Sequence, residues 1–284
     1  MPKTADRVPS LPIQPLTWLN LLCLDAPLVA VSWALLFARG FRMPIAIGGM
    51  SALFLTAWLI YLVDRFGDSV SVENAHPTSL RQRFCRCYSV AWLACSALIA
   101  ATDIVVIFTA LDARQLGLGA GVGACALVYL IVNRALPSVW LILPVKEISI
   151  GFLFAAGTMV PLAGGLTNAV LLAWLLFSGL CCLNCICIAV WERHLDAAQQ
   201  RISIATAFPN ASRALVPLLL LLLGLASLAC GLFAAEAQSV YICIAASAGM
   251  LASVHVFRHD IALDLRTALA DLVLLTPALS LLMR

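Results

Sequence analysis

Long apolar runs follow one another along almost the whole chain. A helix that crosses a bilayer needs roughly twenty predominantly apolar residues, and nine segments of such length can be marked in the sequence. They run approximately from 17 to 38, 44 to 63, 88 to 110, 115 to 133, 147 to 164, 167 to 190, 214 to 235, 238 to 257 and 262 to 283. Because 63% of the residues are hydrophobic and only 11% are charged, the composition excludes an ordinary soluble domain. The sequence therefore predicts an all-α, polytopic membrane bundle of nine transmembrane helices.

Basic residues are distributed unequally between the two sides that these segments define. Cytosolic connections of membrane proteins carry an excess of Lys and Arg. If the N-terminus of this chain is cytosolic, nearly all of its Lys and Arg residues fall on the cytosolic side, and few fall on the opposite side. Those few are Arg39, Arg42, Arg114 and Arg284. We therefore expect residues 1–16 to form a cytosolic N-terminal tail, whose prolines are incompatible with a signal-peptide core, and residues 17–284 to form a single transmembrane domain. We expect an integral protein of a bacterial cytoplasmic membrane.

Net charge and cysteine content do not indicate another class of protein. The net charge of +3 is too small, and the basic residues are too dispersed, for a nucleic-acid-binding protein. Nearly all of the eleven cysteines lie within apolar runs, where Cys behaves as a small apolar residue. Cys182 and Cys185 have CxxC spacing, but a metal site would need a second pair of ligands. We interpret these two cysteines as packing residues.

One acidic pattern occurs twice, each time at the end of an apolar run. The first copy is DRFGD at residues 64–68, and the second is ERHLD at residues 192–196. On a helix, residues at i and i+4 lie on one face about a turn apart, so each copy presents two carboxylates together. Both copies fall on the predicted cytosolic side. We interpret the repetition as a duplication of half-bundles, at about 17–133 and 134–284, with a site between the halves.

Paired carboxylates of this kind are suited to binding a divalent cation together with a diphosphate. Mg²⁺ prefers oxygen ligands and usually binds through one or two carboxylates plus substrate phosphates. Two pairs that face each other across a cavity would supply the ligands Asp64, Asp68, Glu192 and Asp196. The alternative is that these residues are solvated acids at helix ends, although the dipole at a helix C-terminus disfavours negative charge. We favour a Mg²⁺-diphosphate site that opens toward the cytosol.

Basic residues near both acidic copies are candidate ligands for the diphosphate. Arg81 follows the first copy, Lys146 opens the fifth apolar segment, and Arg213 follows the second copy. Arg65 and Arg193 lie inside the copies themselves. An Arg side chain can bind phosphate oxygens through two parallel hydrogen bonds. The alternative for each is an ordinary basic residue of a cytosolic connection.

This set of features resembles the UbiA superfamily of intramembrane prenyltransferases over nearly the whole chain. The first motif of that family is N-D-x-x-D-x-x-x-D, and its last two acids and adjoining Arg are matched at residues 64–68. Ile60 and Tyr61 replace the leading Asn and Asp. The second motif, D-x-x-x-D, is matched by Glu192 and Asp196, with a conservative change at its first position.

Two further positions extend this resemblance. Asn184 resembles an Asn of some branches of the family, and Lys146 resembles the basic residue that precedes the family's fifth helix. The resemblance implies a Mg²⁺-dependent prenyltransferase that ionises an isoprenoid diphosphate and transfers the prenyl chain to a small acceptor. It implies Mg²⁺ as the cofactor. The partners would be a prenyl diphosphate, an unidentified acceptor and the lipid bilayer, with no nucleic acid.

Other functions remain compatible with the same residues. A membrane terpene cyclase of the UbiA type would ionise the same diphosphate and capture the cation with the chain's own double bonds. A non-catalytic membrane protein derived from this family would retain the bundle without the reaction, and the altered start of the first motif allows it. A transporter is disfavoured, because no pair of Gly- or Pro-broken helices occupies matching positions in the two halves.

Several ionisable residues outside the two acidic copies have two interpretations each. Asp25 and Asp103 lie within apolar runs, where a charged side chain is costly and usually faces a cavity. Either could contact the acceptor, or Asp25 could cap a helix and Asp103 could pair with a buried donor. His255 and His259 lie near the junction of the last two segments. They could supply a metal ligand, but we interpret them as residues of a solvated loop.

Overall fold

The computed structural model describes residues 15–71, 77–136, 138–142, 145–162, 165, 167–208, 210–233 and 235–282. Nearly all of the expected N-terminal tail, residues 1–14, lies outside the described residues. The described residues are overwhelmingly helical. In chain order the helices are α1 (Pro15–Leu21), α2 (Asp25–Gly40), α3 (Ile47–Val70), α4 (Leu80–Cys87), α5 (Ser89–Ala110), α6 (Ala113–Ala135), α7 (Val139–Ile142), α8 (Lys146–Met159), α9 (Asn168–Ala198), α10 (Ile204–Ala207), α11 (Ala211–Leu232), α12 (Ala235–Val256), α13 (Leu263–Leu272), η1 (Val273–Leu275) and α14 (Thr276–Leu282).

Each of the nine expected apolar segments coincides with a helix or with a broken helix. The first segment breaks at Cys23, whose φ of 56° lies in the left-handed region and separates α1 from α2. The last is interrupted by the short 3₁₀ turn η1. Seven helices in the described residues are long and apolar enough to cross a membrane, whereas α2 and α8 have only 16 and 14 residues. The all-α membrane bundle is confirmed.

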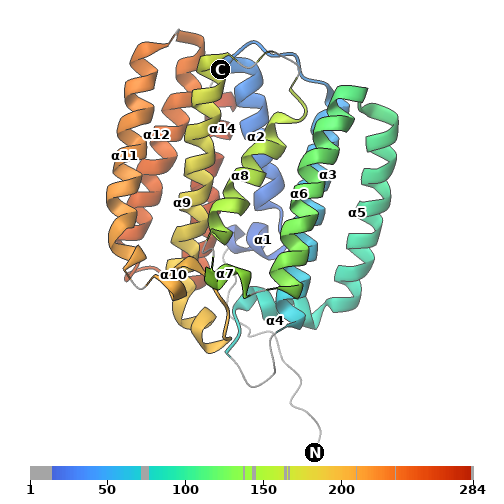
Figure 1. Ribbon diagram of the computed structural model, residues 1–284, viewed down its shortest axis with the longest axis vertical. Coiled ribbons are helices and arrows are strands. Elements are labelled where there is room, and N and C mark those ends of the chain that lie inside the picture. Colours follow the sequence, from blue (N-terminus) through green and yellow to red (C-terminus); the bar gives the residue numbers. More distant parts are fainter. Residues whose placement is uncertain are drawn as a thin grey trace, which may run out of the picture.

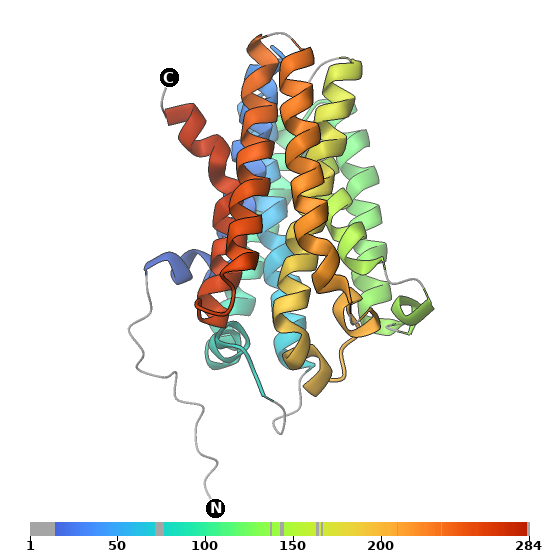
Figure 2. The same cartoon turned by 90° about the vertical axis from the view of Figure 1, so that its left-hand side faces the viewer.

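The long helices stand side by side, and the short helices α4, α7 and α10 gather at one end of the bundle, the lower end in Figure 1. Figure 2 shows the same arrangement from the side, with α11 and α12 running next to α9. The main core fills the space between α2, α9, α11 and α12. Trp33 of α2 stacks on Phe177 of α9 at a ring-centroid distance of 4.3 Å, and its Nε1 donates to the Leu274 carbonyl at 2.8 Å.

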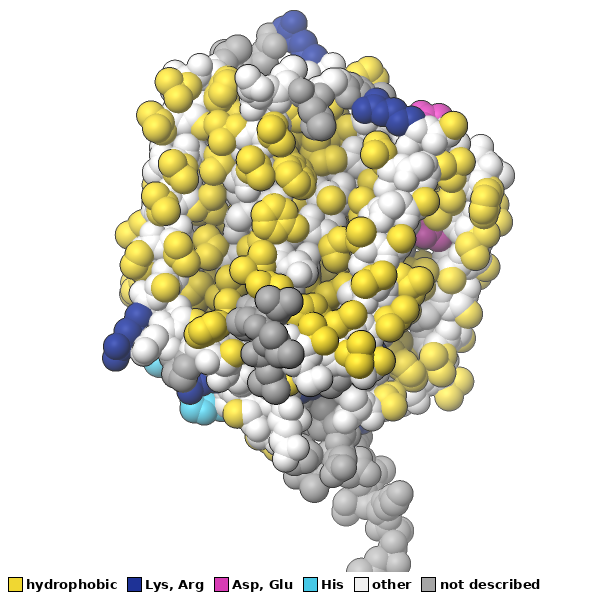
Figure 3. All heavy atoms as spheres, in the orientation of Figure 1, with side chains coloured by type: hydrophobic (Ala, Val, Ile, Leu, Met, Phe, Trp, Pro, Cys, Tyr) yellow, Lys and Arg dark blue, Asp and Glu magenta, His cyan; other side chains and the backbone are white. Residues whose placement is uncertain are grey.

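The outer surface of the bundle is apolar over most of its height. In Figure 3 hydrophobic side chains cover the middle of the visible face, whereas basic side chains gather at its two ends. Along the most apolar stretches of α5 and α6, only 17% and 6% of the residues are buried, and Val90 and Phe108 are 81% and 76% exposed. Exposure of such a large apolar surface to water is unfavourable, whereas its contact with lipid is not. The chain is therefore an integral membrane protein.

One charged residue faces the interior far from the acidic copies. Asp103 of α5 is 4% exposed, and its Oδ2 accepts a hydrogen bond from Thr56 Oγ1 of α3 at 2.7 Å. This contact supports the interpretation in which Asp103 pairs with a buried donor. Polar side chains inside a membrane are tolerated when they find such partners.

Two helices extend further than the apolar runs predicted. The sequence placed their ends near residues 63 and 190, whereas α3 continues to Val70 and α9 to Ala198. Helical hydrogen bonding continues past the apolar part because the polar residues there contact other polar groups instead of lipid. Both acidic copies consequently lie within the last turns of a helix, and their i and i+4 carboxylates share a face.

Candidate active site

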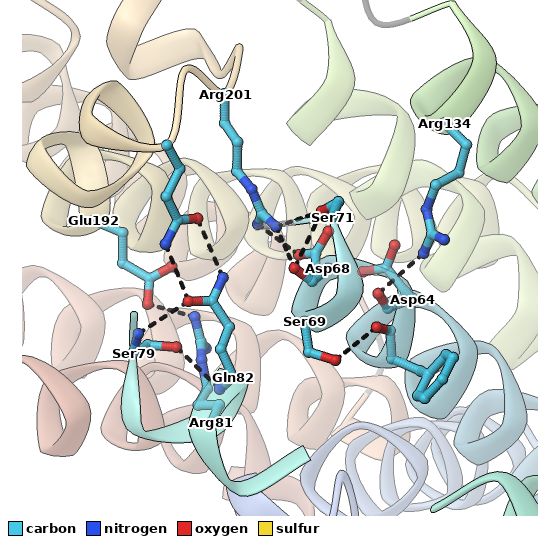
Figure 4. A network of polar contacts seen from close by, with 12 residues as sticks. Asp64, Asp68, Ser69, Ser71, Ser79, Arg81, Gln82, Arg134, Glu192 and Arg201 are labelled. Atoms are coloured by element: carbon cyan, nitrogen blue, oxygen red, sulfur yellow. Dashed lines mark hydrogen bonds and ion pairs between the residues drawn. The ribbon is translucent and has the colours of Figure 1, made fainter. Parts of the chain in front are cut away.

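The two acidic copies lie at the end of the bundle where the short helices gather. Asp64 and Asp68 lie on α3, and Glu192 and Asp196 lie on α9. Each of these four side chains is half-buried. Figure 4 shows Asp64, Asp68 and Glu192 among side chains from α4, α6 and the segment that follows α9. The site is therefore assembled from segments that are far apart in the sequence.

Glu192 is bound by a basic residue of the first connection. Arg81 of α4 donates from Nη2 to Glu192 Oε1 in a close ion pair. The start of α4 is fixed by a capping box, in which Ser79 N donates to Gln82 Oε1 at 3.0 Å and Gln82 N donates to Ser79 Oγ at 3.3 Å. Gln82 also exchanges hydrogen bonds with Gln199, at the end of α9, at 3.1 and 3.2 Å. These contacts hold Arg81 against α9.

Asp68 is bound by a basic residue of the second connection. Arg201 Nη1 donates to Asp68 Oδ2 at 2.9 Å, and Arg201 Nη2 donates to the Asp68 carbonyl at 2.6 Å and to Ser71 Oγ at 3.2 Å. The chain turns back after α9 because Gln200 adopts a φ of 53°, as residues just past a helix C-terminus often do. That turn directs Arg201 toward α3, so each acidic copy has an Arg partner from the other half of the chain.

Asp64 and Asp196 share a different basic neighbour. Both carboxylates interact electrostatically with Lys146, the first residue of α8. Asp64 Oδ1 is buried and has no hydrogen-bond partner among the described residues. A buried carboxylate oxygen without a partner is uncommon in native proteins, and it is the kind of atom that a cation would bind. This oxygen of Asp64 is therefore a candidate ligand for a cation.

A basic residue of α6 contacts the backbone of the first copy. Arg134 Nη2 donates to the carbonyls of Val63 and Asp64 at 3.4 and 3.3 Å. Its guanidinium occupies the space that a Cβ on Gly67 would fill. Positive charge here also complements the C-terminal dipole of α3. Glycine at position 67 is thus explained by the approach of Arg134.

Replacing Gly67 with Ala is expected to displace Arg134 from α3. Ala favours a helix by about 1 kcal/mol over Gly, while the lost hydrogen bonds cost about 1 kcal/mol, so the single variant should change stability little. In an Arg134→Ala background these hydrogen bonds are already absent, so Gly67→Ala should only stabilise the protein, through the higher helix propensity of Ala. Thermal unfolding of the two single variants and the double variant should give a coupling of about 1 kcal/mol. Additive effects would show that the two residues do not interact.

The four predicted metal ligands do not surround one point. No group of three or more His, Cys, Asp or Glu side chains is placed to hold a metal ion in the part of the chain that the structure describes. Glu192 and Asp68 pair instead with Arg81 and Arg201. A Mg²⁺ ion bound with a diphosphate needs only one or two carboxylates, and the unpartnered Asp64 oxygen is available for it. The residues therefore fit a Mg²⁺-diphosphate complex better than a bare ion.

The remaining predicted site residues have different surroundings. Arg65 interacts electrostatically with Asp25, Asp68 and Glu192. Arg193 is half-buried on α9. Arg213 is exposed at the start of α11, and no contact among the described residues joins its side chain to this cluster.

The side chains of two candidate residues, Asn184 and His255, lie in the interior of the bundle. Asn184 Nδ2 donates to Asp271 Oδ1 of α13 at 3.1 Å, in the interior of the bundle. The interpretation of His255 as a loop residue is wrong, because His255 lies on α12, is 2% exposed and accepts a hydrogen bond from Trp191 Nε1 at 3.1 Å. Stacking on Trp191 covers the imidazole ring from solvent.

Sequence reasoning missed several residues that the fold brings to this region. Arg134 was not singled out among the basic residues, and Arg201 was considered only as one of the basic residues that follow the second copy. Gln199 and Glu147 carried no visible signal, and Glu147 of α8 accepts a hydrogen bond from Ile204 N at 3.1 Å. Asp271 could have been found, because it lies in an apolar run as Asp25 does. The others become recognisable only when α4, α6 and α8 are placed around α3 and α9.

Comparison with known proteins agrees with this architecture. No protein-family model matches the sequence, and no curated protein matches it. The structure of a UbiA homolog from Archaeoglobus fulgidus bound to GPP and Mg²⁺ is similar, with a TM-score of 0.56, 15% sequence identity and coverage of 94% of this chain and 100% of that one. A UbiA homolog from the same organism bound to DMAPP and Mg²⁺ gives a TM-score of 0.55 at 14% identity, with coverage of 94% and 99%. This chain has the UbiA fold.

The resemblance seen in the sequence is thus confirmed for the fold. At 15% identity the likeness extends to the arrangement of helices. The chemistry of this chain must be argued from its own residues.

Proposed function

We propose that the chain is a Mg²⁺-dependent intramembrane prenyltransferase, which transfers the prenyl chain of an isoprenoid diphosphate to a small acceptor. One observation carries the proposal: at one end of a UbiA fold, each acidic copy pairs with an Arg from the other half of the chain, Glu192 with Arg81 and Asp68 with Arg201. Acidic and basic groups in one place suit a substrate that combines a metal ion with a polyanion. The UbiA homologs of similar structure were solved with GPP or DMAPP and Mg²⁺.

The four acids and the basic residues around them have separate roles in this proposal. Asp64, Asp68, Glu192 and Asp196 would hold Mg²⁺, which when bound stabilises the negative charge that develops on the leaving diphosphate. Lys146, Arg81 and Arg201 would bind the diphosphate oxygens. Without substrate, Arg81 and Arg201 pair with Glu192 and Asp68, so binding exchanges one anionic partner for another. Arg65, Arg193, Arg213 and Asn184 are further candidate substrate-binding residues.

The interior of the bundle suits the other half of the substrate. An apolar cavity of about 460 Å³ lies between α6, α7, α8 and α9, and side chains including Val128, Phe152 and Trp174 line it. An isoprenoid chain that extends inward from the acids would be kept away from water. Exclusion of water prevents hydrolysis of the allylic cation that forms when the C1–O bond breaks. We place this site on the cytosolic side of a bacterial cytoplasmic membrane, where a soluble diphosphate is available.

Diphosphate release from GPP and from DMAPP by the purified protein tests the proposal. Release should require Mg²⁺ and stop with EDTA. Release that increases when an acceptor is added supports the prenyltransferase. A cyclic hydrocarbon formed from the prenyl diphosphate alone would instead identify a terpene cyclase, which Ile60 and Tyr61 at the start of the first motif do not exclude. If neither substrate is turned over or bound, the chain is a non-catalytic member of this fold.

A further inference from the structure

The apolar cavity between α6, α7, α8 and α9 carries polar groups that a hydrocarbon would leave without partners. Trp140 of α7 and Trp174 of α9 both line this cavity, and Trp140 is only 8% exposed. The Nε1 atom of each indole ring is buried and has no hydrogen-bond partner among the described residues. An indole N–H can only donate, and buried donors in native proteins nearly always have an acceptor. The two tryptophans are therefore suited to a ligand that brings acceptor atoms.

No charged side chain lines this cavity in the part of the chain that the structure describes. Tyr129 of α6 and Ser149 of α8 add hydroxyl groups to its wall, and a hydroxyl group can donate as well as accept a hydrogen bond. A carboxylate or an ammonium group would enter without a counterion, which is costly in apolar surroundings. The wall therefore favours a neutral molecule whose oxygen atoms accept hydrogen bonds, as the oxygen of a carbonyl group does.

Aromatic side chains shape the cavity for a flat ligand. The ring centroids of Tyr129 and Trp140 lie 5.9 Å apart, and those of Phe152 and Trp174 lie 6.0 Å apart. The cavity volume of about 460 Å³ falls in the usual range for cavities that bind small molecules, roughly 300 to 1,000 Å³. Aromatic rings pack favourably against one another in offset or edge-to-face arrangements. A ring system can therefore lie against these four side chains.

The cavity borders both the lipid-facing surface and the proposed diphosphate site. Val128 of α6 lines it and is 59% exposed, so a molecule dissolved in the bilayer could reach it. Val132, which also lines it, precedes Arg134 by two residues on α6. Arg134 in turn donates to the Asp64 carbonyl at 3.3 Å. A ligand in this cavity would therefore lie close to the first carbons of a prenyl chain that extends from the acids.

Taking the proposed function as given, we propose that this cavity binds the acceptor, and that the acceptor is a flat, neutral, lipid-soluble molecule with a carbonyl oxygen. The N–H groups of Trp140 and Trp174 would donate to its oxygen atoms. The prenyl chain would lie beside it, so that the acceptor and the Mg²⁺-diphosphate complex occupy the protein together. The acyl chain of a lipid makes no hydrogen bonds and would leave both indole groups without partners.

Photolabelling with benzophenone tests this site without turnover. Benzophenone is a neutral aromatic ketone that forms bonds to nearby C–H groups on irradiation, and peptide mass spectrometry locates these bonds. We expect label on the residues that line the cavity. Fluorenone, a flat ketone, should reduce this label about tenfold when it fills roughly nine sites in ten. Fluorene, which has a methylene group in place of the carbonyl, should reduce it far less, and equal protection by the two compounds would overturn the proposal.

Replacement of both tryptophans by phenylalanine removes the two donors and keeps an aromatic ring at each position. Trp140→Phe/Trp174→Phe should weaken the binding of fluorenone about tenfold, through the loss of two hydrogen bonds. The matched control is Trp58→Phe/Trp92→Phe, because Nε1 of Trp58 and of Trp92 already donates to a backbone carbonyl at 3.0 Å and neither residue lines the cavity. The control should bind fluorenone as the wild type does. Unchanged binding in the first double variant, or an equal loss in both, would overturn the proposal.

Addition of Mg²⁺ and GPP separates this proposal from the proposed function. Fluorenone should still protect the cavity from benzophenone when both are bound, because the acceptor and the prenyl diphosphate bind together. Complete displacement of the ketones by Mg²⁺ and GPP would show that the prenyl chain alone fills the cavity, and only the acceptor site would fail. If Mg²⁺ and GPP do not raise the melting temperature of the wild type, the prenyltransferase proposal itself fails.

Discussion

Asp64→Asn should lower Mg²⁺-dependent diphosphate release from GPP by about 100-fold or more, the usual cost of removing one group that stabilises a developing charge. Asp64 Oδ1 is a buried oxygen without a described partner at the end of the bundle where the two acidic copies lie, and an Asn side chain in its place carries no charge to bind a cation. The substitution preserves the shape of the side chain. The hydrogen bonds from Arg134 go to the backbone carbonyls of Val63 and Asp64, so they should persist.

Asp103→Asn is the control for this variant. Asp103 also lies on a long apolar helix, and its Oδ1 likewise has no described partner, but its Oδ2 accepts a hydrogen bond from Thr56 away from the acidic copies. The variant should keep the turnover rate of the wild type while losing a little stability. Equal activity of Asp64→Asn and Asp103→Asn would remove the first acidic copy from the mechanism.

Gly151→Ala should destabilise the bundle by about 1–3 kcal/mol, the usual cost of overpacking. A Cβ at position 151 would lie 2.5 Å from the backbone nitrogen and 2.7 Å from the Cα of Cys182, so α8 and α9 would have to move apart. Phe152 of α8 and Trp174 of α9 line the apolar cavity, so separation of the two helices would change its shape. We therefore expect a lower melting temperature in detergent together with weaker GPP binding.

Gly157 provides an internal comparison on the same helix. A Cβ added there meets no atom within 4 Å, so Gly157→Ala should keep or slightly raise the melting temperature through the higher helix propensity of Ala. We therefore expect Gly151→Ala to lower the melting temperature and Gly157→Ala to keep or raise it. A melting temperature that Gly151→Ala does not lower would show that α8 and α9 do not pack closely at Gly151.

The sequence predicted those features that depend on local patterns. Apolar runs of bilayer length predicted the helices, and the i, i+4 spacing of Asp64 and Asp68 predicted that both face the same way, since these depend only on helical geometry. Arg81 was expected near the acids because it follows the first copy, and its pairing with Glu192 agrees with that expectation.

Other features depend on how distant segments meet, and no local pattern contains them. Arg201 reaches Asp68 only because Gln200, two residues past the end of α9, adopts a left-handed conformation that turns the chain. Asp271 contacts Asn20 and Asn184 across the bundle. The ends of α3 and α9 were placed too early because hydropathy marks where lipid contact stops, and a helix can continue beyond that point.

Ligand-dependent thermal unfolding of the purified protein tests the central claim most directly. The wild type would be heated with Mg²⁺ alone, with GPP alone and with both, beside the double variant Asp64→Asn/Asp196→Asn. The account predicts that Mg²⁺ and GPP together raise the melting temperature of the wild type more than the sum of their separate effects, and that the double variant loses this gain. Stabilisation by GPP that is equal with and without Mg²⁺, or that survives in the double variant, would contradict a Mg²⁺-diphosphate site at the two acidic copies.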